Sequence, residues 1–185
     1  MRRYLALPLA AAMTLAAACS SPESGDHEQG SGQAGGDVAT LEQLGIKNPS
    51  APMDHVFCSG QPTEEQFDKL EAAGITHVLH LRTKGESGTG WEEERAAKAD
   101  VRFERLEIAG GKGLTRENVE AFASKLDSYG DETVLVSCGS SNRVGAMFAL
   151  KAAWIDGKSK DEAMAIGKSA GMKSLSDTVD KLLSK

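Results

Sequence analysis

The segment Thr133–Ser137 constrains the fold of this chain more than any other. Three consecutive apolar residues at positions 134–136 predict a short strand that is buried on both faces. A loop of small residues, 139–142, follows, and residues 143–155 then have the apolar spacing of an amphipathic helix. A buried strand that leads directly into a helix indicates an α/β domain with a largely parallel sheet.

The rest of the chain alternates between short apolar runs and helical patterns in the same way. The expected strands are 55–60, 75–81, 101–108 and 133–137, and the expected helices begin near 62, 91, 115, 143, 160 and 174. Polar, glycine-containing loops follow two of the strands, at 82–90 and 109–114. Ligand sites of α/β domains lie at the carboxyl ends of the strands, which is where these loops begin.

The first 18 residues have the composition of an export signal. Arg2 and Arg3 form a positive start, and Tyr4–Ala18 is a run of 15 mostly apolar residues, shorter than the ~20 needed to span a bilayer. Cys19 follows small residues and resembles the lipidated cysteine of a bacterial lipoprotein. The alternative is cleavage after Ala18 by the ordinary signal peptidase, which would release a soluble protein with Cys19 free.

Residues 19–40 are expected to carry the lipid-attachment cysteine and a flexible linker, and residues 41–185 to form one α/β domain. Between positions 20 and 37, nine of 18 residues are Gly or Ser, a composition typical of a flexible coil. Ser20 is not the aspartate associated with inner-membrane retention in enteric bacteria. We therefore expect an outer-membrane lipoprotein on the periplasmic side of a bacterial cell envelope, with the lipid anchor as its only membrane contact.

The charge and cysteine content exclude some classes of protein. The chain has 21 Lys and Arg against 27 Asp and Glu, a formal charge of −6 that becomes −8 if Arg2 and Arg3 leave with a signal peptide. An acidic chain is not expected to bind nucleic acid, which requires neutralisation of phosphates. Three cysteines are too few for a disulfide-based scaffold.

Cys138 and Arg143 bracket the loop that follows the buried strand. Small residues allow the backbone to curl with its N–H groups pointing inward, and the helix N-terminus adds partial positive charge. A guanidinium can hold two oxygens of an anion at once, and the same field favours the nucleophilic thiolate of Cys138. The alternative is that Cys138 is a small buried core residue and Arg143 a surface residue of the helix.

Three segments together resemble the beta-lactamase-hydrolase-like phosphatase family. They are Ser59–Pro62 (SGQP), Gly74–Arg82 (GITHVLHLR), and Cys138 with Asn142–Gly145 (NRVG). The resemblance covers about residues 50–160, and that family is similar to the dual-specificity protein tyrosine phosphatases. It implies a three-layer fold, in which a four- or five-stranded, mostly parallel sheet lies between helices, and a chemistry without metal or cofactor.

By that resemblance, Cys138 is the nucleophile that forms a cysteinyl-phosphate intermediate. The phosphate is bound by Arg143 and by the backbone N–H groups of Gly139, Ser140, Ser141 and Asn142. The implied activity is a phosphoric monoester hydrolase, and its implied substrate is a phosphorylated small molecule or protein.

Two features of the loop depart from the usual pattern of these phosphatases. Four residues rather than five separate Cys138 from Arg143, and Ser137 stands where a histidine commonly precedes the nucleophile. Rhodanese-type sulfurtransferases also have a four-residue loop, whose smaller ring suits a single sulfur atom, so sulfur transfer is an alternative activity. A second alternative is a non-catalytic module that uses the same loop to bind phosphate or another anion.

The expected site departs from the usual pattern at the general acid as well. Related enzymes keep an aspartate after the third strand to protonate the leaving oxygen, but residues 108–113 contain no carboxylate. Glu107 is the candidate replacement, and Glu117 is the other nearest carboxylate. Without a positioned acid, alkoxides that leave poorly would be released slowly.

Other chemistry-bearing residues have competing interpretations. A disulfide between Cys58 and Cys138 would silence the nucleophile, but it requires Cα atoms within about 7 Å, and Cys58 is otherwise a small semi-buried residue. His77 and His80 are three positions apart on a strand and face opposite sides, so they do not share a metal ion. Arg82 ends a predicted strand, and its side chain is expected either to help neutralise an anion or to pair with Glu86.

Two further expectations concern the segment 91–94 (WEEE) and the helix that begins near 143. We expect Glu92, Glu93 and Glu94 to form a solvated helix face, with Trp91 either on that face or above the site. Met147, Phe148, Leu150 and Trp154 have helical spacing and are expected to pack in the core.

Overall fold

A computed structural model describes residues 37–185 of the chain. The expected signal peptide, the lipidation site Cys19 and the linker residues 19–36 lie outside the described residues. Helix α1 (Val38–Gln43) overlaps the last three residues of the expected linker. Its N-cap Asp37 accepts the N–H of Thr40, and the side chain of Leu41 is fully buried.

The core is built on one five-stranded sheet with the order β1-β2-β5-β3-β4. The strands are β1 (Ser50–Met53), β2 (Val56–Gly60), β3 (His77–His80), β4 (Arg102–Arg105) and β5 (Val134–Cys138). The central strand β5 pairs in parallel with β2 and β3, and only the edge strand β1 is antiparallel. The predicted α/β class with a mostly parallel sheet is confirmed.

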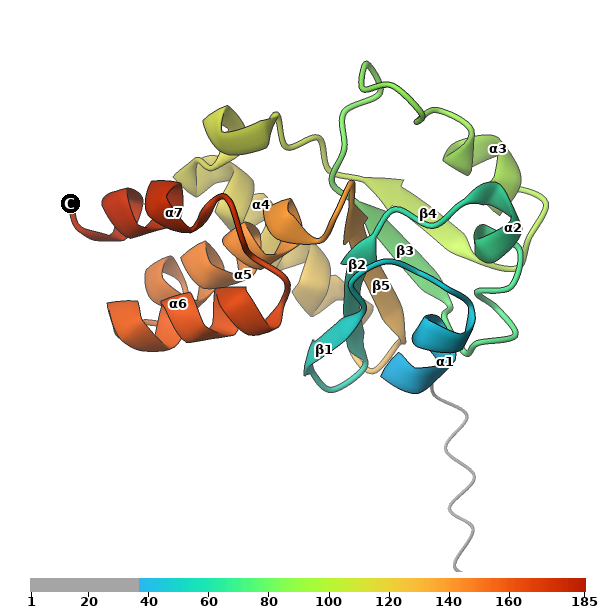
Figure 1. Cartoon of the computed structure of the whole chain (residues 1–185), viewed down its shortest axis with the longest axis horizontal. Helices are drawn as coiled ribbons and strands as arrows, with labels where there is room; N and C mark the ends of the chain where they lie inside the picture. The colour runs from blue at the N-terminus through green and yellow to red at the C-terminus, as the bar shows by residue number, and fades with distance from the viewer. Residues whose placement is uncertain (1–36) are drawn as a thin grey trace, which may run out of the picture. The chain divides into compact units, whose positions relative to one another are not determined.

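Helices cover both faces of the sheet, as Figure 1 shows. On one face lie α1, α2 (Glu64–Phe67) and α3 (Glu92–Ala96), and on the other lie α4 (Arg116–Tyr129), α5 (Asn142–Trp154), α6 (Lys160–Ser169) and α7 (Ser176–Leu183). Successive side chains of β5 point to opposite faces of the sheet. Leu135 packs in the core on the side of α1, α2 and α3, and Val136 packs in the core on the side of α4, α5, α6 and α7. The predicted three-layer arrangement is therefore confirmed.

Some predicted elements have different bounds in the structure. The helix predicted to begin near 62 is α2, which starts with a capping box of Thr63 and Gln66 and ends at Phe67, and residues 68–74 continue as tighter turns. The segment 109–114, predicted to be a flexible loop, contains a 3₁₀ turn, η1 (Gly110–Gly113). The edge strand β1 was not predicted, because its four residues alternate between partly buried and exposed positions.

Helices α5 and α6 approach each other closely at two glycines. A Cβ atom placed on Gly145 would lie 2.3 Å from the backbone nitrogen of Met172 and 2.4 Å from the carbonyl oxygen of Gly167. The predicted core residues of α5 are buried at Met147, Phe148 and Leu150. Trp154 is partly buried, and the Arg116 guanidinium carbon lies over the Trp154 ring, 5.2 Å from the ring centre.

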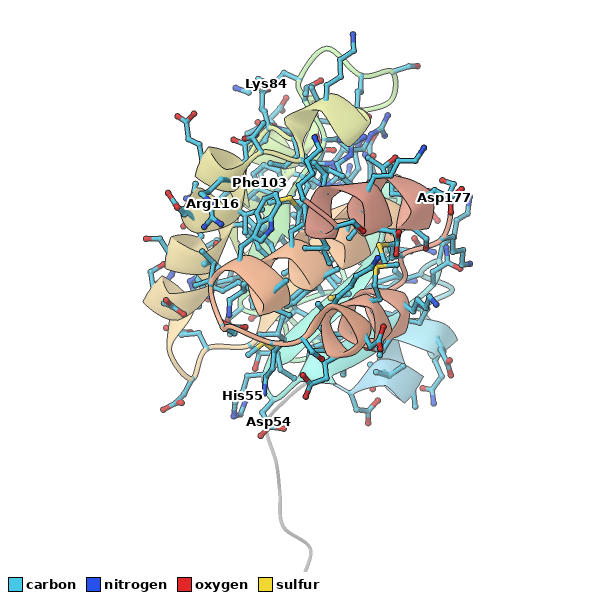
Figure 2. The ribbon with its side chains drawn as sticks, turned by 90° about the vertical axis from the view of Figure 1, so that its left-hand side faces the viewer. Asp54, His55, Lys84, Phe103, Arg116 and Asp177 are labelled. Atoms are coloured by element: carbon cyan, nitrogen blue, oxygen red, sulfur yellow. The ribbon has the colours of Figure 1, made fainter. Side chains whose placement is uncertain are left out.

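The carboxyl ends of the four parallel strands bring their loops to one edge of the sheet. Figure 2 shows Lys84, from the loop after β3, at the opposite end of the molecule from Asp54 and His55, which form the turn between β1 and β2. This loop edge carries the candidate site. Within residues 37–185, no helix has the length and apolarity needed to cross a membrane.

Candidate active site

Cys138 is the last residue of β5 and lies at the loop edge of the sheet. Its neighbour across the ladder is Gly60, the last residue of β2. The thiol side chain is 2% exposed and belongs to the core between the sheet and helices α4 and α5. Cys138 is thus buried in the core, as one interpretation of the sequence expects, and it also stands directly before the loop of small residues, as the other expects.

The loop between β5 and α5 presents a run of free backbone donors. Among residues 37–185, no oxygen accepts the N–H of five consecutive residues. These are Gly139, Ser140, Ser141, Asn142 and Arg143. Consecutive free N–H groups at a helix N-terminus form a site for an anion, since the helix dipole adds to their partial charges. The structure brings together the residues predicted to bind phosphate.

Ser141 gives the loop its shape. It has a left-handed backbone (φ 66°, ψ −11°), which is uncommon for a residue other than glycine. A left-handed residue beside right-handed ones turns successive N–H groups toward a common point. Its hydroxyl donates to the carbonyl oxygen of Ala170 at 2.9 Å, and the side chain is fully buried. Tertiary packing therefore holds a conformation that the local sequence does not favour.

Polar side chains hold the loop from behind. The Asn142 Oδ1 atom accepts the N–H groups of Lys173 at 2.6 Å and Leu175 at 3.3 Å. Asn48 donates its side-chain amide to the carbonyl oxygen of Ser140 at 3.1 Å. These contacts use side chains and a carbonyl group, so they leave the N–H groups of the loop free. Sequence reasoning missed them because Asn48 is 92 residues away from Ser140.

Arg143 is anchored at one side of its guanidinium. Its Nη1 atom donates to the carbonyl oxygens of Leu81 at 2.9 Å and Ile108 at 2.7 Å, and to Glu86 Oε1 at 2.8 Å. Its Nη2 atom donates to Glu86 Oε2 at 3.0 Å. The Nε atom has no acceptor among residues 37–185. The edge formed by Nε and Nη2 therefore keeps donors for two oxygens of an anion.

Glu86 is the ionised partner of Arg143 in the loop 82–90. Its hydrogen bonds with the Arg143 guanidinium lower its pKa to about 2, against the opposing effect of partial burial. Arg82 Nε also donates to Glu86 Oε2 at 3.0 Å, so the predicted pairing of Arg82 with Glu86 is confirmed. Sequence reasoning did not connect Glu86 with Arg143, which lies 57 positions further along the chain.

A buried carboxylate, Glu92, links the loops around the site. It is 1% exposed and accepts from Gln61 Nε2 at 2.8 Å, the Gly90 N–H at 2.7 Å and Arg105 Nη2 at 3.0 Å. Gln61 in turn accepts from Arg82. The prediction that Glu92 lies on a solvated helix face was wrong, because strand and loop donors from separate parts of the chain enclose it.

Trp91 does not lie above the site. Its ring meets Phe67 edge-on, with ring centres 5.6 Å apart, in the core on the opposite side of the sheet from Cys138. The interpretation of Trp91 as a cover for the site was therefore wrong. An aromatic pair at the start of α3 accounts for its position instead.

His80 occupies the position beside Ser137 in the neighbouring strand. Its Nδ1 atom lies 2.8 Å from the Ser137 hydroxyl, and its Nε2 atom lies 3.6 Å from Glu92 Oε1. Burial, followed by the charges of three arginines, lowers the pKa of His80 to about 3, so the ring is neutral. Because Nε2 faces a carboxylate, this geometry favours Ser137 as the donor to Nδ1 and the ring proton on Nε2.

His77 lies on the opposite face of β3 from His80. Its ring packs against Tyr129 of α4, with ring centres 5.1 Å apart, whereas His80 packs near Phe103 in the other core. The prediction that the two rings face opposite sides is confirmed. Within residues 37–185, no group of three His, Cys, Asp or Glu side chains is arranged to hold a metal ion.

The candidate acid Glu107 follows β4 and is exposed. Its Oε1 atom accepts the N–H of Lys84 at 2.7 Å, which turns this oxygen toward the backbone of the loop 82–90. Glu117 is exposed in the first turn of α4. The geometry therefore assigns neither carboxylate to the reaction, and Glu107 stays a prediction.

Cys58 and Cys138 are free thiols on the same face of adjacent strands. Gly60 is the ladder partner of Cys138, so Cys58 is displaced by two residues along β2. At ~3.3 Å per residue and ~4.8 Å between strands, the two Cα atoms are about 8 Å apart, beyond the usual span of a disulfide. Burial, and next the nearby Cys138, raise the pKa of the Cys58 thiol well above its ordinary value.

Alkylation should distinguish these two thiols. We expect iodoacetamide at mildly acidic pH to label Cys138 well before Cys58, because Cys58 is fully buried and its raised pKa keeps it protonated. Peptide mapping by mass spectrometry of the native full chain identifies the labelled residue. In Cys138→Ser, Cys58 should stay unlabelled until the chain is unfolded. Equal or reversed rates in the native protein would remove Cys138 as a nucleophile.

The free donor loop, the cysteine that precedes it and the sheet between helical layers define the class of cysteine-phosphatase folds. Residues 30–174 match the family of the Swiss Army Knife proteins' DSP-PTPase phosphatase domain. The chain belongs to this family, whose members are protein-tyrosine and dual-specificity phosphatase-like hydrolases. The resemblance drawn from its sequence is confirmed, which favours phosphatase over sulfurtransferase chemistry.

Known relatives and solved structures agree with this assignment. Beta-lactamase hydrolase-like proteins from two strains of Xylella fastidiosa are 30% identical over 123 residues, which is 64% of this chain but only 28% of theirs. A DUF442 protein from Shewanella putrefaciens CN-32 superposes with a TM-score of 0.60 at 20% identity, covering 80% of this chain and 97% of that one. The core catalytic domain of the PP-IP phosphatase SIW14 from S. cerevisiae superposes at 0.54, with 15% identity, covering 75% and 86%. The two structural likenesses show the shared fold.

Proposed function

We propose that this chain is a cysteine-dependent phosphatase in which Cys138 is the nucleophile. The supporting observation is the run of free N–H groups from Gly139 to Arg143, which begins at the cysteine and ends at an arginine with one free edge. Donors from the backbone and from a guanidinium can surround the oxygens of a phosphoryl group while its phosphorus faces the sulfur.

The chemistry divides into two displacements at phosphorus. The Cys138 thiolate attacks, an S–P bond forms, and the P–O bond breaks with its electron pair on the leaving oxygen. Water then attacks the cysteinyl phosphate, which releases phosphate and restores the thiolate. The free N–H groups and the Nε–Nη2 edge of Arg143 stabilise the charge on the oxygens of both transition states. Glu86 and the carbonyl oxygens of Leu81 and Ile108 keep that edge in place.

The site is also proposed to act in a bacterial cell envelope, on a phosphorylated small molecule or protein. The sequence of residues 1–19 supports export and attachment through Cys19. Partition into a detergent phase that Cys19→Ala abolishes would support a lipid anchor.

Hydrolysis of an aryl phosphate by the reduced, full-length protein tests the proposed function. Because phenolates with electron-withdrawing groups leave readily, turnover should be measurable even without an acid. Acid quenching during turnover followed by mass spectrometry should find phosphate on the peptide that contains Cys138. Cys138→Ser should show neither turnover nor the covalent intermediate. Turnover that survives in Cys138→Ser, or an absence of turnover in the wild type, would refute the mechanism.

A non-catalytic anion-binding module is the second candidate. The observation that favours it is the missing carboxylate in the segment 108–113, together with the low exposure of Cys138. A binding module would hold inorganic phosphate in both the wild type and Cys138→Ser, with no turnover in either. One structural neighbour, a cysteine-to-serine variant of P. aeruginosa TpbA, is in complex with phosphotyrosine.

A further inference from the structure

The loop 82–90 carries Glu86, the carboxylate that holds Arg143, but its own sequence does not fix its shape. Gly88 and Gly90 have φ angles of 79° and 101°, and a Cβ atom added at either would meet no heavy atom within 4 Å. Glycines in such open, left-handed positions give the backbone conformational freedom. The position of Glu86 therefore depends on the side chains that bind this loop.

Gln61 connects this loop to the rest of the fold. Its amide nitrogen donates to the carbonyl oxygen of Gly88 at 2.7 Å and to Glu92 Oε1 at 2.8 Å. Its amide oxygen accepts from Arg82 Nη1, and Arg82 Nε donates to Glu86 Oε2 at 3.0 Å. The nitrogen of this amide faces two acceptors and its oxygen faces a donor, so the amide fits in one orientation only.

Glu92 orients the Gln61 amide and also holds the end of the loop. A carboxylate can only accept, and its Oε1 atom faces the Gln61 amide nitrogen. Its Oε2 atom accepts from the Gly90 N–H at 2.7 Å and from Arg105 Nη2 at 3.0 Å, so both oxygens are used. The contacts from this carboxylate to the donor loop run through Glu92, Gln61, Arg82, Glu86 and Arg143.

From this chain of contacts we propose that Glu92 is a positioning residue of the reaction, which fixes the free edge of Arg143 without touching the substrate. The proposal rests on the proposed cysteine mechanism and adds a buried residue of helix α3 to it. The Nε–Nη2 edge can bind two phosphoryl oxygens only in the plane of the guanidinium, and Glu86 sets that plane through both of its oxygens. A displacement of about 1 Å at such a group can cost ~10²-fold in rate.

Glu92→Gln tests this proposal in the full-length, reduced protein with an aryl phosphate as the substrate. Glutamine keeps the shape of glutamate but replaces one acceptor oxygen by a donor. If that donor faces Gln61, two amide nitrogens meet, and a reversed Gln61 amide would present a second donor to Arg82. We expect kcat/KM to fall by ~10- to 10²-fold and the Kd of inorganic phosphate to rise, while urea unfolding shows a folded protein.

Glu93→Gln is the matched control. Glu93 is the next residue of α3 and accepts from the same arginine, Arg105, at 2.9 Å and 3.0 Å. Within residues 37–185, Gln61 makes no hydrogen bond to Glu93, so its charge is not part of the proposed chain. This variant should leave kcat/KM and the phosphate Kd unchanged.

A double-mutant cycle separates positioning from a structural role. Glu86→Gln breaks the same chain next to Arg143 and should itself lower kcat/KM. Adding Glu92→Gln to it should then lower kcat/KM by less than about 3-fold more, because the contact through which Glu92 acts is already lost. If Glu92 affects the rate by another route, the two losses should multiply, since independent effects add in free energy.

Gln61→Met gives a second test that does not disturb the buried charge. It removes the amide but leaves Glu92 with the donors of Gly90 and Arg105, so it should also lower kcat/KM by ~10- to 10²-fold, even if Glu92→Gln does not fold. Wild-type rates in a folded Gln61→Met, or losses that multiply with Glu86→Gln, would overturn the positioning role alone. Absence of turnover in the wild type would instead refute the cysteine mechanism on which the proposal rests.

Discussion

Replacing Arg143 by alanine should lower kcat/KM for an aryl phosphate by about 10³-fold, the usual effect of removing a charged donor from a transition state. The Nε atom of this guanidinium has no acceptor among residues 37–185, so its edge with Nη2 keeps donors for a phosphoryl group. The same substitution removes one of the two arginine partners of Glu86 and the hydrogen bonds to Leu81 and Ile108. Steady-state kinetics with the reduced protein measure the loss.

Arg143→Lys separates charge from geometry. Lysine keeps a positive charge but lacks the planar fork that can serve Glu86 and a phosphoryl group together, so it should recover only a small part of the rate. Circular dichroism and urea unfolding must show that both variants remain folded. If a folded Arg143→Ala stays within 10-fold of the wild type, Arg143 does not bind the phosphoryl group.

Gly145→Ala should destabilise the fold by about 3 kcal/mol, at the upper end of what overpacking usually costs. The added methyl group would meet backbone atoms of Met172 and Gly167, which cannot rotate away as a side chain can. Helices α5 and α6 would have to separate, and this would strain the hydrogen bond from the Lys173 N–H, just after α6, to Asn142 at the start of α5. Urea unfolding followed by circular dichroism measures the change.

Gly85→Ala is the matched control. Gly85 lies in the loop after β3, has no heavy atom within 4 Å of the position of an added Cβ, and does not have a positive φ. Its substitution should change the free energy of unfolding by less than about 0.5 kcal/mol, as is usual for surface positions. A similar small change in Gly145→Ala would show that the close approach of α5 and α6 is not maintained in solution.

The central part of the fold could be predicted because its signals are local. Three apolar residues in a row identified β5, and regular apolar spacing identified α5, so the loop between them was placed correctly. Cys138, Arg143 and the residues between them come together because they are adjacent in sequence. The two histidine rings of β3 could also be assigned to opposite faces from the two-residue period of a strand.

The remaining parts of the site depend on contacts between distant segments. Nothing near Glu92 indicates that Gln61 and Arg105 will enclose it, and a run of three glutamates is more typical of a solvated face. The pairing of Glu86 with Arg143 and the support of Ser140 by Asn48 likewise join residues far apart in the sequence. The spacing of apolar residues along the sequence does not indicate which polar side chains will meet in space. These hydrogen bonds and ion pairs could therefore not be predicted from sequence patterns.

The left-handed Ser141 has a consequence for how the protein acquires activity. Its conformation is held by the carbonyl group of Ala170, while Asn48 and Lys173 fix the residues on either side. These partners come from both ends of the domain, and a nascent or partly folded chain lacks them. Contacts between distant segments form late in folding. Anion binding should therefore emerge only once the whole domain has assembled, so it serves as a readout of complete folding rather than of local loop formation.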